Sequence, residues 1–410
     1  MNILKSSLFV AVAAALFAFQ NPDLKSKPKI KPSLTKEFVV KELHDATAQY
    51  KIMAARTPLQ RMPKTYYADK DSLETSNTSW WTSGFYPGTL LYLYEFQKDP
   101  VLWTEIEKRL HILEKEQFNK GTHDLGFMLY CSFGAANRLK PNPQYKAVLL
   151  QGAESLSSRY NKNVEAIRSW DHNKDKWQFP VIIDNMMNLE FLNWASRESG
   201  NPKYADIARK HSDKTIKHHF RSDFSSYHVV DYDTLSGAVR HQHTAQGFSH
   251  ASAWSRGQAW GLYGYVMMYR DTRDKAYLAQ SVHIAEYILN HPHLPADAIP
   301  YWDFDADNIP NAKRDASAAA IIASALLELQ GYVKAEQQTK YLKYAEKMLT
   351  SLASNSYKAQ AGTNGGFILK HSVGYLNANS EVDVPLSYAD YYYVEALVRY
   401  KKLLEGKSVI

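Results

Sequence analysis

The spacing of apolar side chains predicts one helix after another from about residue 36 to the end of the chain. Trp103, Ile106 and Leu110, for example, recur at intervals of three or four residues and so share one face of a helix. The pattern predicts helices over 36–54, 86–97, 100–118, 124–139, 143–160, 184–199, 202–220, 253–270, 274–290, 316–333, 336–357 and 388–405.

Strand-like alternation is limited to short pieces such as 227–232. The chain shows no regular alternation of strands with helices, so a nucleotide-binding α/β fold is not expected. The fold class predicted from the pattern is therefore all-α.

An internal repeat groups the helices into hairpins. Asn142-Pro143-Gln144-Tyr145 and Asn201-Pro202-Lys203-Tyr204 each open an amphipathic helix where the preceding helix ends, and 99–100, 274–277 and 339–341 stand at similar points. The spacing is roughly 60–70 residues, about the length of one helical hairpin with a long loop. Proline at the first helical position, preceded by Asn or Asp, is a physical start signal.

Six such hairpins can close into a ring with a less polar inner layer and an amphipathic outer layer. Richness in Gly, Ala and aromatic residues assigns these predicted helices to the inner layer: 124–139, 184–199, 253–270, 316–333 and the one from 388 onward. The long loops then gather at one end of the ring.

The N-terminus has the pattern of a secretory signal. Lys5 precedes an apolar run from Leu8 to Phe19, with Ala18 as a small residue near the end. The run is too short to cross a bilayer comfortably. We expect a signal peptide over 1–20, a disordered leader over 21–35 and a single domain over 36–410. An exported protein, periplasmic or secreted and without a membrane anchor after signal removal, follows from this.

Composition narrows the partners. The 410 residues carry a formal net charge of +7, spread along the chain without a dense Lys/Arg block, so nucleic acid is not expected and an anionic small molecule fits better. The 15 histidines include the pairs His218/His219 and His241/His243, and neither spacing is a metal-ligand pattern. We expect no metal and no cofactor. Cys131 is the single cysteine, so there is no internal disulfide.

Two aspartates begin predicted inner helices. Asp124 follows a histidine, His123, and Asp184 follows the wholly apolar run 181–183. Asp is also a common helix N-cap, which is the alternative for both. Two close carboxylates raise the pKa of one of them, as a general acid requires, whereas a helix N-terminus favours the charged form.

An arginine between two tryptophans suits an acidic sugar. Arg256 lies one helical turn from Trp260 and close to Trp254. Its planar fork pairs both oxygens of a carboxylate, and indole rings stack on sugar rings. The alternative is an aromatic core stripe with an exposed arginine. Further candidates are His228, Thr244 and Gln246, on predicted loop, and Trp81 as another stacking wall.

These blocks together resemble the unsaturated glucuronyl hydrolases of glycoside hydrolase family 88. The similarity covers nearly the whole chain after the signal. It is carried by these segments: 81–85 (Trp-Thr-Ser-Gly-Phe), 123–127 (His-Asp-Leu-Gly-Phe), 184–188 (Asp-Asn-Met-Met-Asn), 254–260 (Trp-Ser-Arg-Gly-Gln-Ala-Trp), 301–304, 314–318 and 388–392.

The resemblance implies an (α/α)6 barrel and the removal of a 4,5-unsaturated uronic acid from the non-reducing end of lyase-generated oligosaccharides. In that family the C4=C5 double bond is hydrated, and no cofactor is required. The matching positions imply that Asp184 protonates C4 and helps activate water, and that Asp124 is the second essential acid. They imply a uronate site of Asn185, His228, Gln246, Arg256 and Trp260, with Trp81, His123, Thr244 and Trp254 as neighbours.

Two alternatives remain at this stage. The related family 105 of unsaturated rhamnogalacturonyl hydrolases shares the barrel and a catalytic Asp. A catalytically silent glycan-binding toroid would also use stacking tryptophans and an arginine, but it has no need of both Asp124 and Asp184. We expect any preference for a sulfated neighbouring sugar to depend on the loops around 370–374 and 380–383.

Overall fold

The helices of the protein alternate between two layers. A computed structural model describes residues 31–410, of which Pro32–Ile410 form one compact unit. The predicted signal peptide (1–20) and most of the predicted leader lie outside the described residues. The α-helices of this unit are α1 (Lys36–Arg56), α2 (Phe85–Gln97), α3 (Pro100–Leu113), α4 (Ala135–Leu139), α5 (Pro143–Ser157), α6 (Leu189–Ser199), α7 (Lys203–His219), α8 (Ser255–Thr272), α9 (Lys275–Asn290), α10 (Ala316–Leu329), α11 (Ala335–Leu352) and α12 (Ser387–Leu404).

Side-chain caps fix where several of these helices begin. Thr35 accepts a hydrogen bond from the backbone N–H of Phe38 at the start of α1. Asp99 and Asn142 cap α3 and α5 in the same way, each with a proline in the first turn, and Asp274 caps α9. The start signals at Asp99, Asn142 and Asp274 are therefore physical helix starts, because each side chain satisfies an otherwise unpaired N–H. The segment 339–341 of the repeat is not a start, because it lies inside α11, which begins at Ala335.

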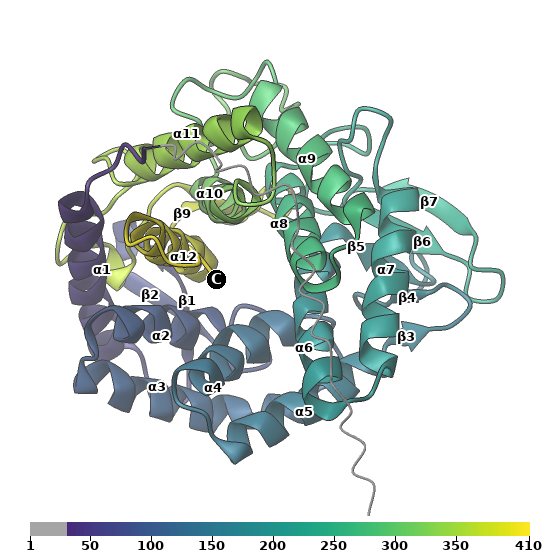
Figure 1. Ribbon diagram of the computed structural model, residues 1–410, viewed down its shortest axis with the longest axis horizontal. Helices are drawn as coiled ribbons and strands as arrows, with labels where there is room; N and C mark the ends of the chain where they lie inside the picture. The colour runs from purple at the N-terminus through teal and green to yellow at the C-terminus, as the bar shows by residue number, and fades with distance from the viewer. Residues whose placement is uncertain (1–30) are drawn as a thin grey trace, which may run out of the picture. The chain divides into compact units, whose positions relative to one another are not determined.

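Within this unit the even-numbered helices form an inner ring and the odd-numbered helices surround them (Figure 1). Helix α10 packs against both α8 and α12, and α12 packs against α2, which closes the ring. Every residue of α10 is buried, as expected for a helix enclosed on all sides. The fold is an (α/α)6 barrel, as predicted. The five inner helices expected from composition are all inner, and α2 is the sixth.

Two inner helices begin irregularly, and these are the two at the candidate acids: Asp124 precedes one irregular segment and Asp184 lies within the other. A π-helix, η3 (Gly126–Gly134), leads into α4, and a 3-10 helix, η4 (Ile183–Asn188), leads into α6. The backbone N–H of Gly126 donates to Asn188 Oδ1 at 2.8 Å. A Cβ at position 126 would lie 2.8 Å from the Cα of Asn188, so only glycine permits this approach. The two acid-bearing segments are thereby joined directly.

Short strands lie in the segments that connect the helices. The hairpin β1 (Met62–Tyr67)–β2 (Ser72–Ser76), the small pair β3 (Tyr160–Asn161)–β4 (Ala166–Ile167) and the hairpin β8 (Ser372–Tyr375)–β9 (Ser380–Val384) accompany a three-stranded antiparallel sheet of β5 (Pro180–Ile182), β6 (Val229–Tyr232) and β7 (Val239–His243). The remaining 3-10 turns are η1 (Ala68–Lys70), η2 (Glu114–Phe118), η5 (Asn364–Gly366) and η6 (Leu376–Ala378).

The strand predicted over 227–232 is confirmed by β6, whereas β5 was not predicted. Val181 and Ile182 are buried residues of β5, and pairing with β6 sets their conformation, whereas the buried Ile183 begins η4. An apolar run this short cannot be assigned to strand or helix from periodicity alone. None of the described helices is long and apolar enough to cross a membrane.

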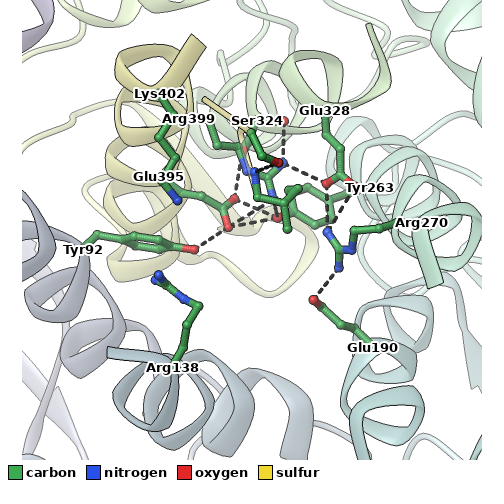
Figure 2. A network of polar contacts seen from close by, with 12 residues as sticks. Tyr92, Arg138, Glu190, Tyr263, Arg270, Ser324, Glu328, Glu395, Arg399 and Lys402 are labelled. Carbon is green, nitrogen blue, oxygen red and sulfur yellow. Dashed lines mark hydrogen bonds and ion pairs between the residues drawn. The ribbon is translucent and has the colours of Figure 1, made fainter. Parts of the chain in front are cut away.

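A network of charged side chains links several inner helices. Figure 2 shows Arg270 of α8 between Glu190 of α6 and Glu328 of α10. Arg399 of α12 reaches the same Glu328 at 3.3 Å and lies 3.5 Å from Glu395. This ion-pair network therefore ties four inner helices together.

Candidate active site

A cavity of about 320 Å³ opens at the N-terminal ends of the inner helices. Loops that precede η3, η4 and α2 supply most of its wall. Six of the residues predicted for the site line it: Trp81, His123, Asp124, Asp184, Gln246 and Arg256. The other lining residues are Ser79, Trp80, Gly121, Thr122, Ser169, Trp170, His172 and Ile182.

Asp184 is the buried acid of this cavity. It is 7% exposed, and its Oδ2 has no hydrogen-bond partner in the described part of the chain. Its side chain does not cap η4, so the capping alternative fails for this residue. Burial raises the pKa of Asp184 to about 7, with a contribution from the negative charge of Asp124, while Arg256 opposes the shift. Near pH 7 this carboxyl can both donate and accept a proton.

His228 presents one defined nitrogen to Asp184. Its Nδ1 accepts backbone N–H bonds from Ala245 and Gln246, both at 3.1 Å. The proton of the neutral ring therefore lies on Nε2, which is 3.7 Å from Asp184 Oδ2. Burial, reinforced by the positive charge of Arg256, lowers the pKa of His228 to about 3. A neutral N–H donor thus faces the acid at neutral pH.

Asp124 and His123 form the second acidic group. The Nε2 of His123 is 3.3 Å from Asp124 Oδ1, and Thr122 Oγ1 donates to Asp124 Oδ2 at 2.6 Å. Burial lowers the pKa of His123, and the charge of Asp124 opposes this effect. Asp124 is half-buried at the cavity wall, so its carboxylate is open to hydroxyl groups of a bound sugar.

Arg256 is fixed by acceptors from two other elements. Its Nη1 donates to Asp315 Oδ2 at 3.1 Å and to the carbonyl oxygen of Val373, and its Nη2 donates to the carbonyl oxygen of Gly374 at 2.6 Å. Its Nε has no partner in the described part of the chain. The guanidinium group is 1% exposed, so it acts as a rigid positive charge at the cavity wall.

Asp315 also caps α10, accepting from the backbone N–H groups of Ser317 and Ala318. One carboxylate therefore sets both the start of an inner helix and the position of Arg256. The segment 314–318, which contributed to the family resemblance, acquires a physical role in this way.

Buried aromatic rings pack around these charges, and of the four described next only Trp81 lines the cavity itself. Trp254 lies 4.5 Å from the ring of His228, and the guanidinium of Arg256 lies 4.5 Å from the ring of Trp254. Trp81 packs on Phe127 at 5.6 Å, and Phe127 packs on the fully buried Trp260 at 5.1 Å. The indole N–H of Trp260 has no partner at hydrogen-bonding distance among the described residues, yet it is close enough to favour the charged form of Asp184.

The remaining predicted residues shape the site. Asn185 donates to the carbonyl oxygen of Ile167 at 2.8 Å, and its side chain also favours the protonated form of His123. Thr244 Oγ1 accepts from the N–H of Gly247 at 2.7 Å, which folds the loop that carries Gln246. Gln246 itself donates to the carbonyl oxygen of Gly374 at 3.1 Å. Thr244 therefore acts on the loop, whereas Gln246 lies at the cavity wall.

Trp170 and His172 are cavity residues that the sequence did not identify as site residues. They lie on the loop before β5, and their rings stack at 5.4 Å with an interplanar angle of 16°. Trp80, which is 40% exposed, is a further wall residue. Aromatic residues in a long polar loop were the available signal, but the loop's direction depends on the β5–β6 pairing. Within residues 31–410 no three His, Cys, Asp or Glu side chains gather as a metal-ligand set.

Known proteins share both the sequence and the fold. The chain is 47% identical over 325 residues to an unsaturated glucuronyl hydrolase of Formosa agariphila, covering 79% of this chain and 80% of the relative. A crystal structure of an unsaturated glucuronyl hydrolase specific for heparin superposes with a TM-score of 0.87 at 49% identity, covering 92% of this chain and 100% of that one.

A substituted form of the Streptococcus agalactiae unsaturated glucuronyl hydrolase, complexed with dGlcA-GalNAc6S, superposes with a TM-score of 0.77 at 27% identity. It covers 91% of this chain and 94% of that one. No protein-family model matches the chain.

Proposed function

The chain belongs to the unsaturated glucuronyl hydrolases, and on this basis we propose that Asp184 is the proton donor of its reaction. It is a glycosidase that removes a 4,5-unsaturated uronic acid from the non-reducing end of an oligosaccharide. The relatives favour this reading over the family 105 alternative and over a silent toroid. The observation that carries the proposal is a buried carboxyl with a pKa of about 7 and no partner for its Oδ2, at the wall of a cavity.

The neutral form of Asp184 starts the reaction by donating its proton to C4 of the unsaturated ring. Positive charge then develops at C5, where the ring oxygen shares it, and a water molecule adds to C5. The proton released by this water returns to Asp184, so the acid is regenerated. The C5 hemiketal opens, and the neighbouring sugar leaves. Protonation of an enol ether requires a carboxyl group that is still neutral near the working pH. The burial of Asp184 supports this, because it raises the pKa of the carboxyl.

The neighbours of Asp184 stabilise its charged form when the proton has left. The Nε2–H of His228, 3.7 Å away, needs only a small shift to donate to the carboxylate. Arg256 supplies a fixed positive charge for Asp184 and for the uronate carboxylate. Asp124 binds ring hydroxyls, and Trp81 and Trp254 provide apolar ring faces.

The substrate class follows from the chemistry of this cavity. An acidic, flat, unsaturated ring matches a cavity with a buried arginine, aromatic walls and one neutral acid. We propose oligosaccharides left by lyases acting on glycosaminoglycan-type or ulvan-type polysaccharides as the source. The heparin specificity of one relative and the sulfated ligand of another support the glycosaminoglycan choice.

The test is loss of the ultraviolet absorbance of the conjugated uronate when the protein meets a panel of lyase-generated unsaturated disaccharides. We expect the wild type to consume at least one of them and Asp184→Asn to bind it without turnover. Asp390→Asn is the matched control, since Asp390 is also buried with a pKa raised by burial to about 7 but accepts from Ile368 N–H, Leu369 N–H and Tyr50. Folded Asp390→Asn should keep its turnover. Turnover by Asp184→Asn would refute the role of the acid.

We also propose that the protein is exported, on the strength of Lys5 and the apolar run 8–19. Periplasmic or secreted location would bring it to oligosaccharides made by extracellular lyases. Sequencing the N-terminus of the mature protein after cell fractionation tests this, and a chain that retains Met1 in the cytoplasm would contradict it.

A further inference from the structure

The loop 244–252 supplies the hydrogen-bond donors that fix His228. The backbone N–H groups of Ala245 and Gln246 donate to His228 Nδ1, both at 3.1 Å. The ring proton is therefore left on Nε2, the nitrogen that faces Asp184. The position of this loop decides which form of the imidazole meets the acid.

A buried carboxylate outside the cavity anchors the other half of the loop. Asp303 is fully buried and is not among the residues that line the cavity. Its Oδ2 accepts the backbone N–H of Phe248 and the hydroxyl of Ser252, both at 2.8 Å. Its Oδ1 accepts the backbone N–H of Asp305 at 2.9 Å. Burial raises the pKa of this carboxyl, while the three donors favour its charged form.

The three donors require a carboxylate at position 303. They approach both oxygens of the side chain, and each of the two oxygens receives one backbone N–H. An asparagine side chain has one oxygen and one NH2 group, so it would turn a donor toward the N–H of either Phe248 or Asp305. A buried N–H group that loses its acceptor is destabilising, so the backbone around it must shift.

The loop also packs closely on this carboxylate. A Cβ at Gly247 would lie 3.1 Å from Asp303 Oδ2 and 2.7 Å from Thr244 Oγ1. On its other side, the segment that carries Asp303 pairs with the approach to α8, where the N–H of Phe304 donates to the carbonyl oxygen of Ala253 at 3.0 Å. Asp303 therefore joins the loop to the segment that leads into α8.

We propose that Asp303 is a positioning residue of the reaction, which holds the loop 244–252 so that His228 presents its Nε2–H to Asp184. This inference rests on the proposed function, because it takes Asp184 as the acid. Asp303 acts only through the loop and the imidazole. The segment 301–304, which contributed to the family resemblance, acquires a physical role in this way.

Other side chains hold the loop through its carbonyl oxygens. Arg221 Nη2 donates to the carbonyl oxygen of His250, and Asn377 Nδ2 donates to that of Gly247, both at 2.8 Å. These contacts do not depend on the carboxylate of Asp303. The substitution Asp303→Asn should therefore displace the loop locally without unfolding it.

The pKa of Asp184 reports whether His228 is held in place. A ring that carries its proton on Nδ1 presents a bare Nε2 to Asp184, and a bare nitrogen favours the protonated carboxyl. The pKa of Asp184 should then rise. Asp184 also faces Arg256, which lowers its pKa, and Asp124, which raises it, and Asp303→Asn keeps both of these charges. Loss of the negative charge of Asp303 alone would lower the pKa, so the direction of the change separates the two effects.

The first measurement needs no substrate. Nitrogen NMR of protein labelled at histidine shows which ring nitrogen carries the proton, and the spectrum of His228→Gln identifies the signals of His228. We expect the proton on Nε2 in the wild type and a mixture of both forms in Asp303→Asn. Asp390→Asn is the matched control, because Asp390 is equally buried and accepts the backbone N–H groups of Ile368 and Leu369. It should leave the His228 signals unchanged.

The second measurement is the pH profile of kcat/KM for one unsaturated disaccharide. In Asp303→Asn we expect the alkaline limb to move to higher pH by about one unit, the typical size of one hydrogen bond to a charged group. Adding Asp303→Asn to His228→Gln should produce no further shift, because residues of one network are not additive. Ser252→Ala removes one donor and keeps the carboxylate, so it should give a smaller shift in the same direction. It replaces Asp303→Asn if that variant does not fold.

Unchanged His228 signals in folded Asp303→Asn would overturn the proposal. A limb that stays in place or moves to lower pH would overturn it too, and so would a shift that adds fully to that of His228→Gln. In each of these cases a wild type that consumes the disaccharide leaves the proposed function intact. A wild type that consumes no unsaturated disaccharide overturns the proposed function, and the nitrogen spectra still decide whether Asp303 holds His228.

Discussion

Two cavities of the barrel have similar volumes, but the charged groups are paired in one and left without partners in the other. The cavity at the N-terminal ends of the inner helices has about 320 Å³, and a second cavity, whose lining includes Glu190, Arg270 and Glu395, has about 310 Å³. In the first, Asp184 Oδ2, His228 Nε2 and Arg256 Nε have no partner within residues 31–410. In the second, Glu395 accepts from Tyr92, Tyr263 and Ser324 (Figure 2).

The difference shows which charges hold the fold and which are left for chemistry. Arg270 and Arg399 pair with Glu328 across three helices, so their burial is compensated within the protein. The charge of Asp184 is not compensated in this way, and its raised pKa expresses that cost. An active site keeps polar groups unpaired because the substrate is to pair with them, and stability elsewhere must offset the cost.

The largest effect on stability should come from breaking the ion pairs that Glu328 makes with Arg270 and Arg399. Glu328→Gln leaves Arg270 and Arg399 without their shared carboxylate, and we expect the free energy of unfolding to fall by about 3–5 kcal/mol. Urea unfolding measures this. The protein that remains folded should keep its kcat. Unchanged stability would mean that the network contributes nothing net.

Replacing the unpaired Asp184 is expected to change the free energy of unfolding in the opposite direction. The pKa of Asp184 is raised from 3.8 to about 7 in the folded protein. The protonated carboxyl therefore stabilises the folded state relative to the unfolded state, and this stabilisation is lost as the pH rises through about 7. Asp184→Asn removes that loss. We expect it to be more stable than the wild type at pH 8, by up to about 4 kcal/mol for three pKa units, and equal to it near pH 4. Melting curves at the two pH values check this, and a destabilised variant at pH 8 would contradict it.

The activity of the wild type should follow the same titration. Because neutral Asp184 donates the proton, kcat/KM should fall about tenfold per pH unit above about 7. A pH profile of kcat/KM with one unsaturated disaccharide measures this alkaline limb. A profile that stays flat to pH 9 would remove Asp184 from the role of acid.

The smallest effect is expected on the pKa of Asp184 when the charge next to Arg256 is removed. Asp315→Asn keeps an acceptor for the α10 cap but removes the negative charge beside Arg256. The positive field of Arg256 at Asp184 then grows, so the alkaline limb should move to lower pH by a fraction of a unit. The shift of the limb, rather than the rate itself, is the readout. A shift to higher pH would show that Arg256 has instead moved away from Asp184.

The inner helices were predictable from sequence because they are enclosed on every side. Their side chains must therefore be small, apolar or aromatic all around the helix. Richness in Gly and Ala identified α8 and α10, and proline after Asn or Asp identified the outer starts of α3 and α5. Asp184 attracted attention because it follows an apolar run, and the structure traces that run to β5. The catalytic and binding roles of the named residues stay predictions.

The sequence by itself determined the helical repeat, the (α/α)6 barrel and the family. Tertiary structure alone decided that Asp184 lacks a partner for its Oδ2, that Arg256 is held by Asp315 and by β8, and that Trp170 and His172 reach the cavity. The physical reason is range. Periodicity and caps act between residues a turn or two apart, whereas a pKa and a cavity wall depend on side chains brought together from six helices and the loops between them.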